Sequence, residues 1–419
     1  MMHRLYSALG ILGTPFIRHW LGKRRARGKE DAARFAERFG HASLPRPPGK
    51  LIWLHAASVG EAQSVLTLAR ALLAQPTAPT LLVTTGTVTS AALVAQQSIP
   101  RLLHHYIPVD TYPPVKRFLD HWRPDLALWV ESEFWPQLLL QTHARGIPLL
   151  LINARLSARS QRNWQRWPRQ IQRLLRCFTT IFASTAEDAT RLRSLGAAGI
   201  VEAGNLKFDA APLDVDAGTL AMLRRTIGGR PLWVAASTHA NEEQMVAEAH
   251  RTVRQQHPNA LCVLAPRHAA RGDAIAAELR AAGYPVAQRS KHEPIKADTA
   301  IYLADTMGEL GVFYSVAPIV FLGGSLVAHG GHNPLEPARL DCAILTGPHM
   351  HNFSAMLQQF TAQNAMRIVA DAAELAAAVN RLLRNPAEAQ AMAVSALQIT
   401  QQNRGATQAI LTRIREVLP

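Results

Sequence analysis

Short apolar runs alternate with segments of helical periodicity along most of this chain of 419 residues. Such alternation is typical of βαβ units, in which parallel strands are covered by helices on both faces. The runs lack polar alternation, which fits strands that are buried on both sides. The first series of predicted strands covers 51–57, 80–85, 126–130, 148–153 and 180–183. The second series covers 232–236, 261–265, 300–303, 319–322 and 343–346.

Two such series predict an α/β fold with two Rossmann-like domains that face a central cleft, with ligands at the carboxyl ends of the strands. A stretch of mixed polar composition at 205–230 is the best linker candidate. We therefore expect a first domain at 31–209 and a second at 210–419, which ends in an alanine-rich helical tail. Neither half has a G-x-G-x-x-G fingerprint after its first strand, and the chain has no Walker motif, so a nicotinamide or flavin dehydrogenase is disfavoured.

Positive charge is concentrated in the first half of the chain. The formal net charge is +15; residues 1–209 carry 27 Lys and Arg against 13 Asp and Glu, or +14, and residues 210–419 carry 18 against 17, or +1. We expect the first domain to meet an anionic partner. The three cysteines are isolated in apolar surroundings, which indicates core thiols and no zinc site. Two histidine pairs, His329 with His332 and His349 with His351, lack the carboxylate or cysteine that would complete a metal site.

The N-terminal segment, 1–30, combines an apolar run at 5–17 with a basic stretch at 18–29 that contains no acid. The apolar run is too short to span a bilayer, and no signal-peptide cleavage site follows it. The positive charge behind it would keep the remaining chain cytoplasmic. One interpretation is a helix packed on its own domain. We favour a membrane-interface anchor, because the apolar and basic stretches adjoin.

A second basic feature is a run of arginines with a spacing of three or four residues and no acid among them. Its members are Arg155, Arg159, Arg162, Arg166, Arg169, Arg173 and Arg176. On a helix they would form one stripe, which Pro168 would kink or divide. A solvated helix face is one interpretation. The lack of compensating glutamates favours contact with an anionic membrane surface or a phosphorylated lipid.

A glycine-rich loop follows the predicted strand at 319–322. Two glycine pairs, 323–324 and 330–331, would let a ligand approach the backbone, and Asn333, Pro334 and Glu336 read as a helix start. Backbone N–H groups and the helix dipole would then favour a phosphate there. A capping box alone would also explain Asn333 and Glu336, but the glycine pairs favour ligand binding.

Carboxylates follow two predicted strands of the first domain. Glu61 lies where a helix begins and could accept a proton from an attacking hydroxyl, although Ser58 and Glu61 also read as a capping box. The helix dipole would stabilise its ionised form and so make Glu61 a weaker base. Glu131 ends its strand and is the better candidate to face the cleft, whereas Glu133 could cap the next helix.

Candidate phosphate-binding groups lie elsewhere. Lys207, near the expected domain boundary, could balance charge on a phosphate leaving group, or be an ordinary surface lysine. Arg267 follows the strand at 261–265, and Met307–Gly308–Glu309 precedes a predicted helix. Together with the loop at 323–336, these residues come from three strand ends of one domain, which is how a nucleotide site is assembled.

Nine blocks of the chain, in matching order, resemble the Kdo transferases, which move 3-deoxy-D-manno-octulosonic acid (Kdo) from its CMP ester to the lipid A precursor. The blocks are 57–61 (ASVGE), 84–87 (TTGT), 131–136 (ESEFWP), 153–157 (NARLS), 204–209 (GNLKFD), 236–239 (ASTH), 266–268 (PRH), 307–310 (MGEL) and 333–336 (NPLE). The resemblance extends from about residue 3 to about residue 360. The alanine-rich tail after residue 370 matches nothing distinctive.

The resemblance implies an inverting GT-B glycosyltransferase that needs no metal or cofactor and works on the cytoplasmic face of the inner membrane. It implies that Glu61 is the general base and that Glu131 and Lys207 stabilise the transition state. The positions implied to hold CMP are Pro266, Arg267, Met307, Gly308, Glu309, Asn333, Pro334, Leu335 and Glu336. The implied partners are CMP-Kdo, the phosphorylated lipid A precursor (lipid IVA) in lipopolysaccharide synthesis, and the anionic inner-membrane surface, with no nucleic acid. We assign Arg155, Arg159, Arg162 and Arg166 to the acceptor or membrane side.

Two alternatives stay open at this point. A UDP-sugar transferase or UDP-sugar 2-epimerase would use the same architecture, and binding of UDP in place of CMP would distinguish it. A non-catalytic protein that binds a membrane or a nucleic acid would need only the basic half, and it would leave the glycine and carboxylate blocks without a purpose.

Overall fold

The computed structural model describes residues 2–418, without the side chains of 2–12 and Thr14. The described residues form two compact units, one of 2–210 with 403–418 and one of 211–402. Each described unit is an α/β structure built on a parallel sheet of seven strands. The predicted fold class, two Rossmann-like domains, is therefore confirmed.

The first sheet has the strand order β3-β2-β1-β4-β5-β6-β7. Its strands are β1 (Leu51–Ala56), β2 (Thr80–Thr85), β3 (Leu102–Tyr106), β4 (Leu126–Val130), β5 (Leu149–Ala154), β6 (Thr180–Ala183) and β7 (Ile200–Glu202). The chain winds outward from β1 to β3 and then returns to place β4 on the other side of β1. The carboxyl ends of β1 and β4 therefore flank the topological switch point, where ligands of such sheets bind.

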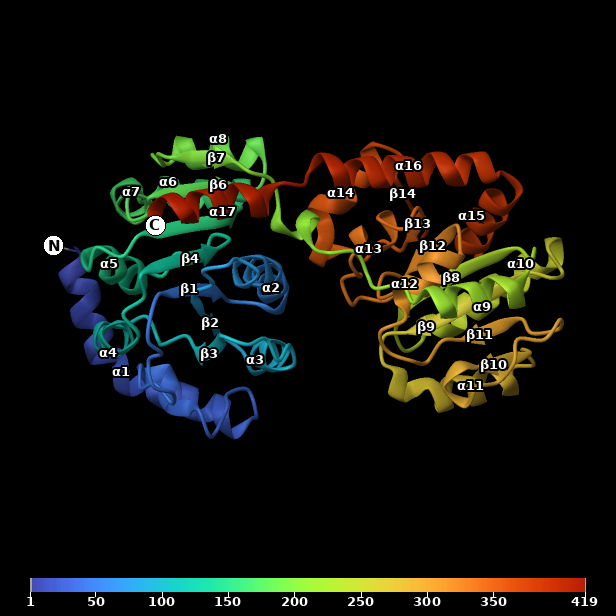
Figure 1. The fold of residues 1–419 in the computed structure, drawn as a ribbon, viewed down its shortest axis with the longest axis horizontal. Helices are drawn as coiled ribbons and strands as arrows, with labels where there is room; N and C mark the ends of the chain where they lie inside the picture. Colours follow the sequence, from blue (N-terminus) through green and yellow to red (C-terminus); the bar gives the residue numbers. More distant parts are fainter. Residues whose placement is uncertain (1, 419) are drawn as a thin grey trace. The chain divides into compact units, whose positions relative to one another are not determined.

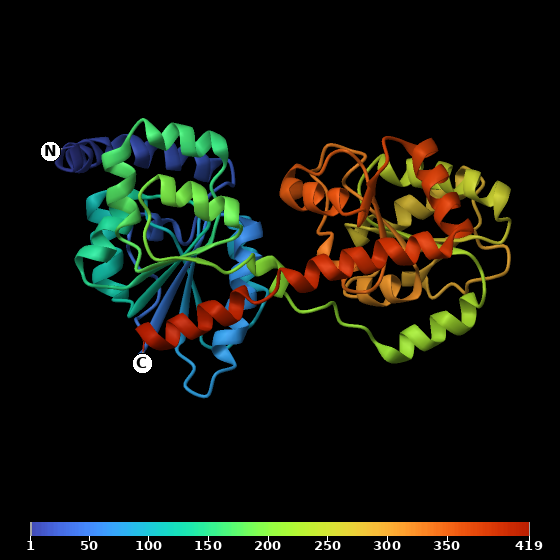
Figure 2. The same cartoon turned by 90° about the horizontal axis from the view of Figure 1, so that it is seen from above.

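Helices cover both faces of this sheet. Figure 2 shows its strands lying between the two layers of helices. The helices of this unit are α1 (Met2–Ala26), α2 (Val59–Leu73), α3 (Val88–Ala95), α4 (Tyr112–Trp122), α5 (Pro136–Ala144), α6 (Ala158–Gln165), α7 (Pro168–Leu175), α8 (Ala186–Ser194) and α17 (Ala406–Val417). One core packs α4, α5, α7 and α8 against the sheet, with Trp53, Phe118 and Trp129 at its centre. The other packs α2, α3 and α17 against the opposite face.

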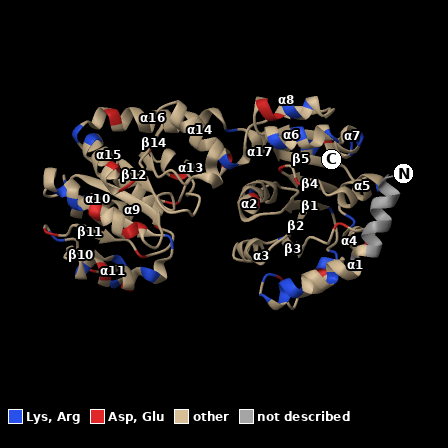
Figure 3. Ribbon diagram, turned by 180° about the vertical axis from the view of Figure 1, so that it is seen from behind, with Lys and Arg blue, Asp and Glu red and all other residues tan. Residues whose placement is uncertain are grey.

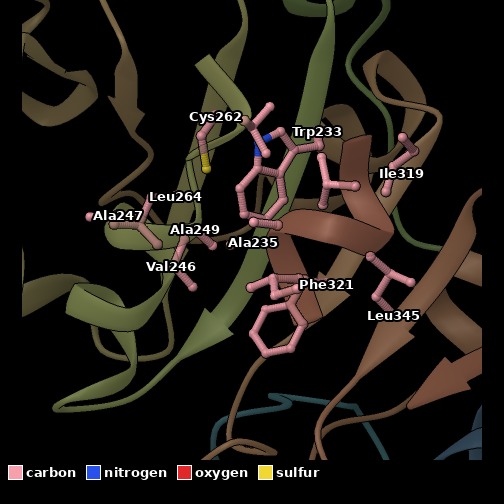
Figure 4. Close-up of a cluster of buried hydrophobic side chains, with 14 of the residues drawn as sticks. Trp233, Ala235, Val246, Ala247, Ala249, Cys262, Leu264, Ile319, Phe321 and Leu345 are labelled. Carbon is pink, nitrogen blue, oxygen red and sulfur yellow. The ribbon is translucent and has the colours of Figure 1, made fainter. Parts of the chain in front are cut away.

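The second sheet has the order β10-β11-β9-β8-β12-β13-β14, with its switch point between β8 and β12. Its strands are β8 (Leu232–Thr238), β9 (Leu261–Pro266), β10 (Val286–Gln288), β11 (Ile301–Leu303), β12 (Ile319–Leu322), β13 (Ala343–Thr346) and β14 (Met366–Ile368). Its helices are α9 (Ala217–Ile227), α10 (Glu242–Gln256), α11 (Gly272–Ala281), α12 (Leu310–Val316), α13 (Leu335–Ala338), α14 (Ser354–Ala362), α15 (Ala372–Arg384) and α16 (Pro386–Gln402). Figure 4 shows the core on one face, where Trp233, Phe321 and Leu345 from three strands meet Val246 from α10.

The four strands that the sequence did not predict are β3, β7, β10 and β14, and they are the four edge strands of the two described sheets. Three of them are only three residues long, and β3 carries two histidines. An edge strand is paired on one side and partly exposed, so it needs a shorter and less apolar run than a central strand. The ten strands that were predicted are the ten interior ones.

The C-terminal boundary of the second domain was wrong, because residues from Asn403 onward belong to the first unit. The N–H groups of Gly405 and Thr407 donate to the Asp209 carboxylate, and Arg413 donates to Thr180 of β6 at 2.9 Å. Figure 1 shows the red α17 among the elements of that unit. The apolar side chains of α17, such as Ile410 and Ile414, are buried in its core. The linker predicted at 205–230 contains α9 and a short 3-10 helix at Leu206–Asp209.

The N-terminal segment is not separate from the first unit. Leu21 on α1 is buried, Arg24 pairs with Glu30 at 2.7 Å, and Arg25 lies over the Phe35 ring. The second half of α1 is thus a helix packed on its own domain, while Phe16 and Trp20 stay exposed. The side chains in most of the apolar run at 5–17 lie outside the described residues, so contact of that run with a membrane stays a prediction.

Candidate functional site

Glu61 lies at the carboxyl end of β1, in the first turn of α2. Its backbone N–H donates to the Ser58 Oγ at 3.3 Å, while its carboxylate accepts from the Ser58 hydroxyl and from the Ala57 N–H, each at 2.8 Å. Ser58 is the N-cap of α2, so the capping interpretation is correct. The carboxylate is also buried, with a residue exposure of 6%.

The expectation that Glu61 is a weak base was wrong. The pKa of Glu61 is raised to about 7, mainly by burial. The capping hydrogen bonds oppose this shift, and the nearby carboxylates of Glu131 and Glu133 add to it. Desolvation penalises the charged form more than the helix terminus stabilises it. A carboxylate of this kind is ionised for about half of the time at neutral pH and is well matched to general-base chemistry there.

Glu131 follows β4, the neighbour of β1, so the fold brings it to the same sheet edge as Glu61. Its backbone has a φ of 57°, a left-handed conformation that is unfavourable for a residue with a side chain, and its N–H donates to Ile152 of β5 at 3.0 Å. Glu133 does not cap α5, because the N-cap residue of α5 is Trp135. The N–H groups of Gln137 and Leu138 instead donate to the buried carboxylate of Asp110, a residue that we did not single out.

Lys207 joins these carboxylates from a different part of the chain. A side chain at Gly60 would come within 4.0 Å of the Lys207 Nζ, so the ammonium lies over the start of α2. Burial lowers the pKa of Lys207, and Glu131 and Glu61 oppose that shift. Asn153 holds the preceding segment, because its Oδ1 accepts from the Leu206 N–H at 3.2 Å. The three predicted catalytic residues of the first unit are therefore brought together around one sheet edge.

In the second unit, predicted nucleotide-binding residues line a small pocket of about 40 Å³. Pro266, Arg267, Met307 and Gly308 line it, together with Ser237. Ser237 lies near the end of β8, Pro266 ends β9, and Met307 and Gly308 follow β11, so three neighbouring strand ends build the pocket. The sequence predicted the ends of β9 and β11, but its third strand end, the loop at 323–336 after β12, does not line this pocket.

The polar side chains of Glu309 and of the 333–336 block form hydrogen bonds within the protein. The Glu309 carboxylate receives hydrogen bonds from Arg289 and Thr306, and the Arg289 guanidinium lowers the pKa of Glu309. The helix α13 begins at Leu335, whose N–H donates to the Asn333 Oδ1 at 3.1 Å. Burial raises the pKa of Glu336, which accepts a hydrogen bond from the Asn333 amide at 3.3 Å.

The glycine-rich loop is not an open anion cradle, which corrects the sequence prediction. The N–H groups of Gly324, Ser325 and Leu326 all donate to the buried carboxylate of Glu242 on α10. A side chain at Gly323 would come within 2.7 Å of Thr238, and one at Gly331 would clash with Met350. These glycines make room for the protein's own packing across the switch point.

Four histidines converge beside the pocket that Pro266 and Arg267 line, and they were missed as a group. We call His239, His268, His329 and His332 the histidine cluster. The Nε2 atoms of His239 and His332 are 3.0 Å apart, and the His239 ring stacks on His329 with centroids 3.9 Å apart. His239 also meets His268 edge to face. Their contact depends on three strand ends and could not be seen from the spacing in the sequence.

The predicted basic stripe runs along α6 and α7, with Arg155, Arg166 and Arg176 just outside the helix ends. Arg166 and Trp167 separate the two helices, and Pro168 begins α7, so the proline divides the stripe as predicted. Figure 3 shows Lys and Arg positions in blue along the ribbon of these two helices. Within the described residues, none of the seven arginines has a carboxylate partner, and all but Arg155 are exposed. Trp167, 55% exposed, lies among them.

A pocket of about 800 Å³ lies between α5 and α7. Arg145, Arg169, Arg173 and Arg176 line it, and Asp120 pairs with Arg145 at 2.8 Å. Across 2–418 no helix has the length and apolar character needed to cross a bilayer. Among the described side chains there is also no group of three or more His, Cys, Asp or Glu placed to hold a metal ion.

Proteins of known family match this chain over most of its length. The family model described as "3-Deoxy-D-manno-octulosonic-acid transferase (kdotransferase)" matches residues 33–210. The chain is 36% identical over 397 residues to the "Probable 3-deoxy-D-manno-octulosonic acid transferase, mitochondrial" of Arabidopsis thaliana. The alignment covers 92% of this chain and 89% of that protein. It is 32% identical over 425 residues to the 3-deoxy-D-manno-octulosonic acid transferase of Haemophilus influenzae, with coverage of 100% and 99%.

A solved structure shows the same fold at low sequence identity. The UDP-GlcNAc 2-epimerase from Neisseria meningitidis bound to UDP-GlcNAc superposes with a TM-score of 0.56 at 14% identity, covering 88% of this chain and all of the other. At this identity the likeness concerns the fold alone.

Proposed function

Because the chain belongs to the 3-deoxy-D-manno-octulosonic-acid transferase family, we propose that it transfers Kdo from CMP-Kdo to the phosphorylated lipid A precursor, with inversion and with Glu61 as the general base. The observation that carries the proposal is the buried Glu61 carboxylate at the switch point of the first sheet, with its pKa raised to about 7.

In the proposed reaction, Glu61 accepts the proton of an acceptor hydroxyl while that oxygen attacks the anomeric carbon of Kdo. The bond between this carbon and the phosphate oxygen breaks on the opposite face, and CMP leaves as a phosphate monoester. Negative charge grows on the departing phosphate, so cations near the reacting groups lower the barrier. Lys207, half-buried beside Glu61 and Glu131, is the candidate cation of the first unit.

The pocket lined by Pro266, Arg267, Met307 and Gly308 supports the assignment of the second unit to the donor. The exposed Arg267 guanidinium can pair with a phosphate, and the pocket lies at the strand ends where nucleotides bind in such sheets. Glu309 and Glu336 act in this proposal by holding the pocket walls, because both are bonded within the protein.

The arginine stripe and the pocket between α5 and α7 support an anionic partner for the first unit. Exposed arginines without a described carboxylate partner attract phosphate-bearing lipids, and exposed aromatic side chains such as Trp167 and Trp20 favour the membrane interface. We therefore propose that the chain works at the cytoplasmic surface of the inner membrane, with the lipid phosphates against α6 and α7. Metal independence is part of the proposal.

The test is transfer by the full chain. Incubation with CMP-Kdo and the tetraacylated lipid A precursor is expected to add the mass of Kdo to the acceptor, with and without chelator, and Glu61→Gln is expected to abolish the product. CMP is expected to compete with the donor and UDP is not. A chain that binds UDP in preference to CMP, or that leaves the acceptor mass unchanged, would overturn the proposal.

A further inference from the structure

The contact between His239 and His332 constrains the protonation of both rings. An imidazole nitrogen either carries a hydrogen or accepts one, so two Nε2 atoms 3.0 Å apart share one proton when both rings are neutral. A second proton in this contact would place two N–H groups head to head and add one positive charge to the pair. The contact therefore holds a single proton.

The surroundings of the pair are cationic and lack a free acid. The groups that face it are Arg267, His268 and Arg271 beyond β9, His329 in the loop after β12, and Glu242 and Glu243 at the start of α10. Glu336 faces Arg267, and His351 lies beside Gly330 of the same loop. Glu242 is occupied by four backbone N–H groups, and Glu243 by Arg271.

The pKa of both His239 and His332 is lowered to about 4, mainly by burial, with a smaller contribution from the neighbouring histidines and Arg267. The described surroundings of the two rings thus contain arginines and no carboxylate that is free to pair with a charged histidine. An anion placed among these rings would favour their charged form and raise their pKa.

The histidine cluster adjoins the nucleotide pocket. Ser237, two residues before His239, and Arg267, next to His268, both line that pocket. A nucleotide in the pocket would therefore bring its negatively charged groups toward Arg267 and the cluster. His268 and His329 are exposed, so the cluster is open to solvent on that side.

We propose that His239 and His332, with Arg267, form the anion subsite of the donor, and that this histidine pair takes up a proton from the solvent when the anion binds. The inference rests on the proposed function, because the donor supplies the anion. The anion is a phosphate or a carboxylate, since the donor carries both. The added proton separates the two rings, so that each can donate an N–H to the anion.

Proton uptake is measured by titration calorimetry of the full chain at one pH in two buffers with different ionisation enthalpies. CMP supplies the phosphate alone, free Kdo the carboxylate alone, and cytidine neither. We expect uptake with CMP, with Kdo or with both, and none with cytidine. Because a phosphate monoester itself titrates near pH 6, the uptake assigned to the protein is the difference between wild type and His332→Gln.

Two further variants control for folding and for position. His239→Gln removes the buried partner, and the far-ultraviolet spectrum and melting temperature show whether it folds; His332→Gln, which is less buried, keeps the test available if it does not. His292→Asn is the matched control: His292 is exposed in the same unit, has a φ of 57°, and Asn tolerates that conformation. It should bind CMP with the same uptake as wild type.

The affinity of wild type for the anion should fall as the pH rises above about 4, by up to tenfold per pH unit relative to His332→Gln, since each proton taken up gives one unit of slope. Equal buffer dependence in wild type and His332→Gln would overturn the inference and leave nucleotide binding intact. Uptake with cytidine would also overturn it. Failure of wild type to bind CMP at all would overturn the proposed donor, and with it this inference.

Discussion

The carboxylate of Glu242 accepts a hydrogen bond from the backbone N–H of Gly324 at 2.6 Å, across the switch point between β8 and β12. The same carboxylate accepts from Ser325, Leu326 and His239, so one buried side chain satisfies four backbone donors. Three of these donors belong to the glycine-rich loop that the sequence suggested for a ligand.

Glu242→Gln should therefore destabilise the second unit. An amide in place of the carboxylate offers one acceptor oxygen and turns an NH₂ group toward backbone donors. Leaving buried donors without an acceptor should cost about 2–4 kcal/mol. Chemical denaturation monitored by Trp233, the one tryptophan between residues 211 and 402, measures this change. Glu248→Gln, exposed on the same helix, should be neutral. An equal stability of both variants would mean that the four hydrogen bonds contribute little.

Glu61→Gln should reduce the turnover of Kdo transfer by about 10²–10⁴-fold, since the amide keeps the shape and the cap but cannot accept a proton. The affinity for CMP should stay within about twofold, because no nucleotide-binding role is assigned to Glu61. In wild type, the rate should rise with pH up to about 7 and then level off, following ionisation of Glu61. Near-normal turnover of the variant would leave Glu61 as a helix cap only.

Glu61 should also make the first unit less stable at high pH. Its pKa is about 7 in the folded chain against an ordinary 4.5, so the folded state holds the proton more tightly than the unfolded state. Stability is thus lost as the pH rises from about 4.5 to about 7, by at most about 3 kcal/mol. Glu61→Gln should remove this dependence, so its advantage over wild type in denaturant melts should grow between pH 5 and pH 8. Parallel curves across this window would contradict the raised pKa.

Lys207→Met should lower turnover by about 10²–10³-fold, because it removes a cation beside the reacting groups. Loss of the positive charge should also disfavour the ionised form of Glu61, which shifts the acid limb of the pH–rate profile to higher pH. Lys207→Arg keeps the charge and should retain the position of that limb. A profile that does not move in Lys207→Met would show that Lys207 does not act on Glu61.

Reversal of Arg159, Arg162 and Arg166 to Glu should weaken binding to vesicles that contain an anionic phospholipid by at least about 100-fold, since each cation near such a surface contributes about 1 kcal/mol. The remaining binding should depend less on salt. The matched control reverses Arg225, Arg251 and Arg254, which lie on α9 and α10 and change the net charge equally. An equal loss in the control would indicate a net-charge effect without a specific surface.

The sequence alone determined the ten interior strands, the two-unit α/β fold and the grouping of Glu61 and Glu131 at one sheet edge. Strands buried on both faces need uninterrupted apolar runs, which are visible in the sequence. Residues directly after neighbouring parallel strands must meet at one edge, so the candidate site could also be predicted. The edge strands could not, because partial exposure leaves them without such a signature.

Only the tertiary structure decided how these groups behave. Glu242 fills the glycine-rich loop, Asp110 caps α5, and the four histidines meet through contacts between segments far apart in the chain. The base strength of Glu61 was misjudged for the same reason: the helix dipole is local and visible in the sequence, whereas desolvation depends on the segments that bury the carboxylate.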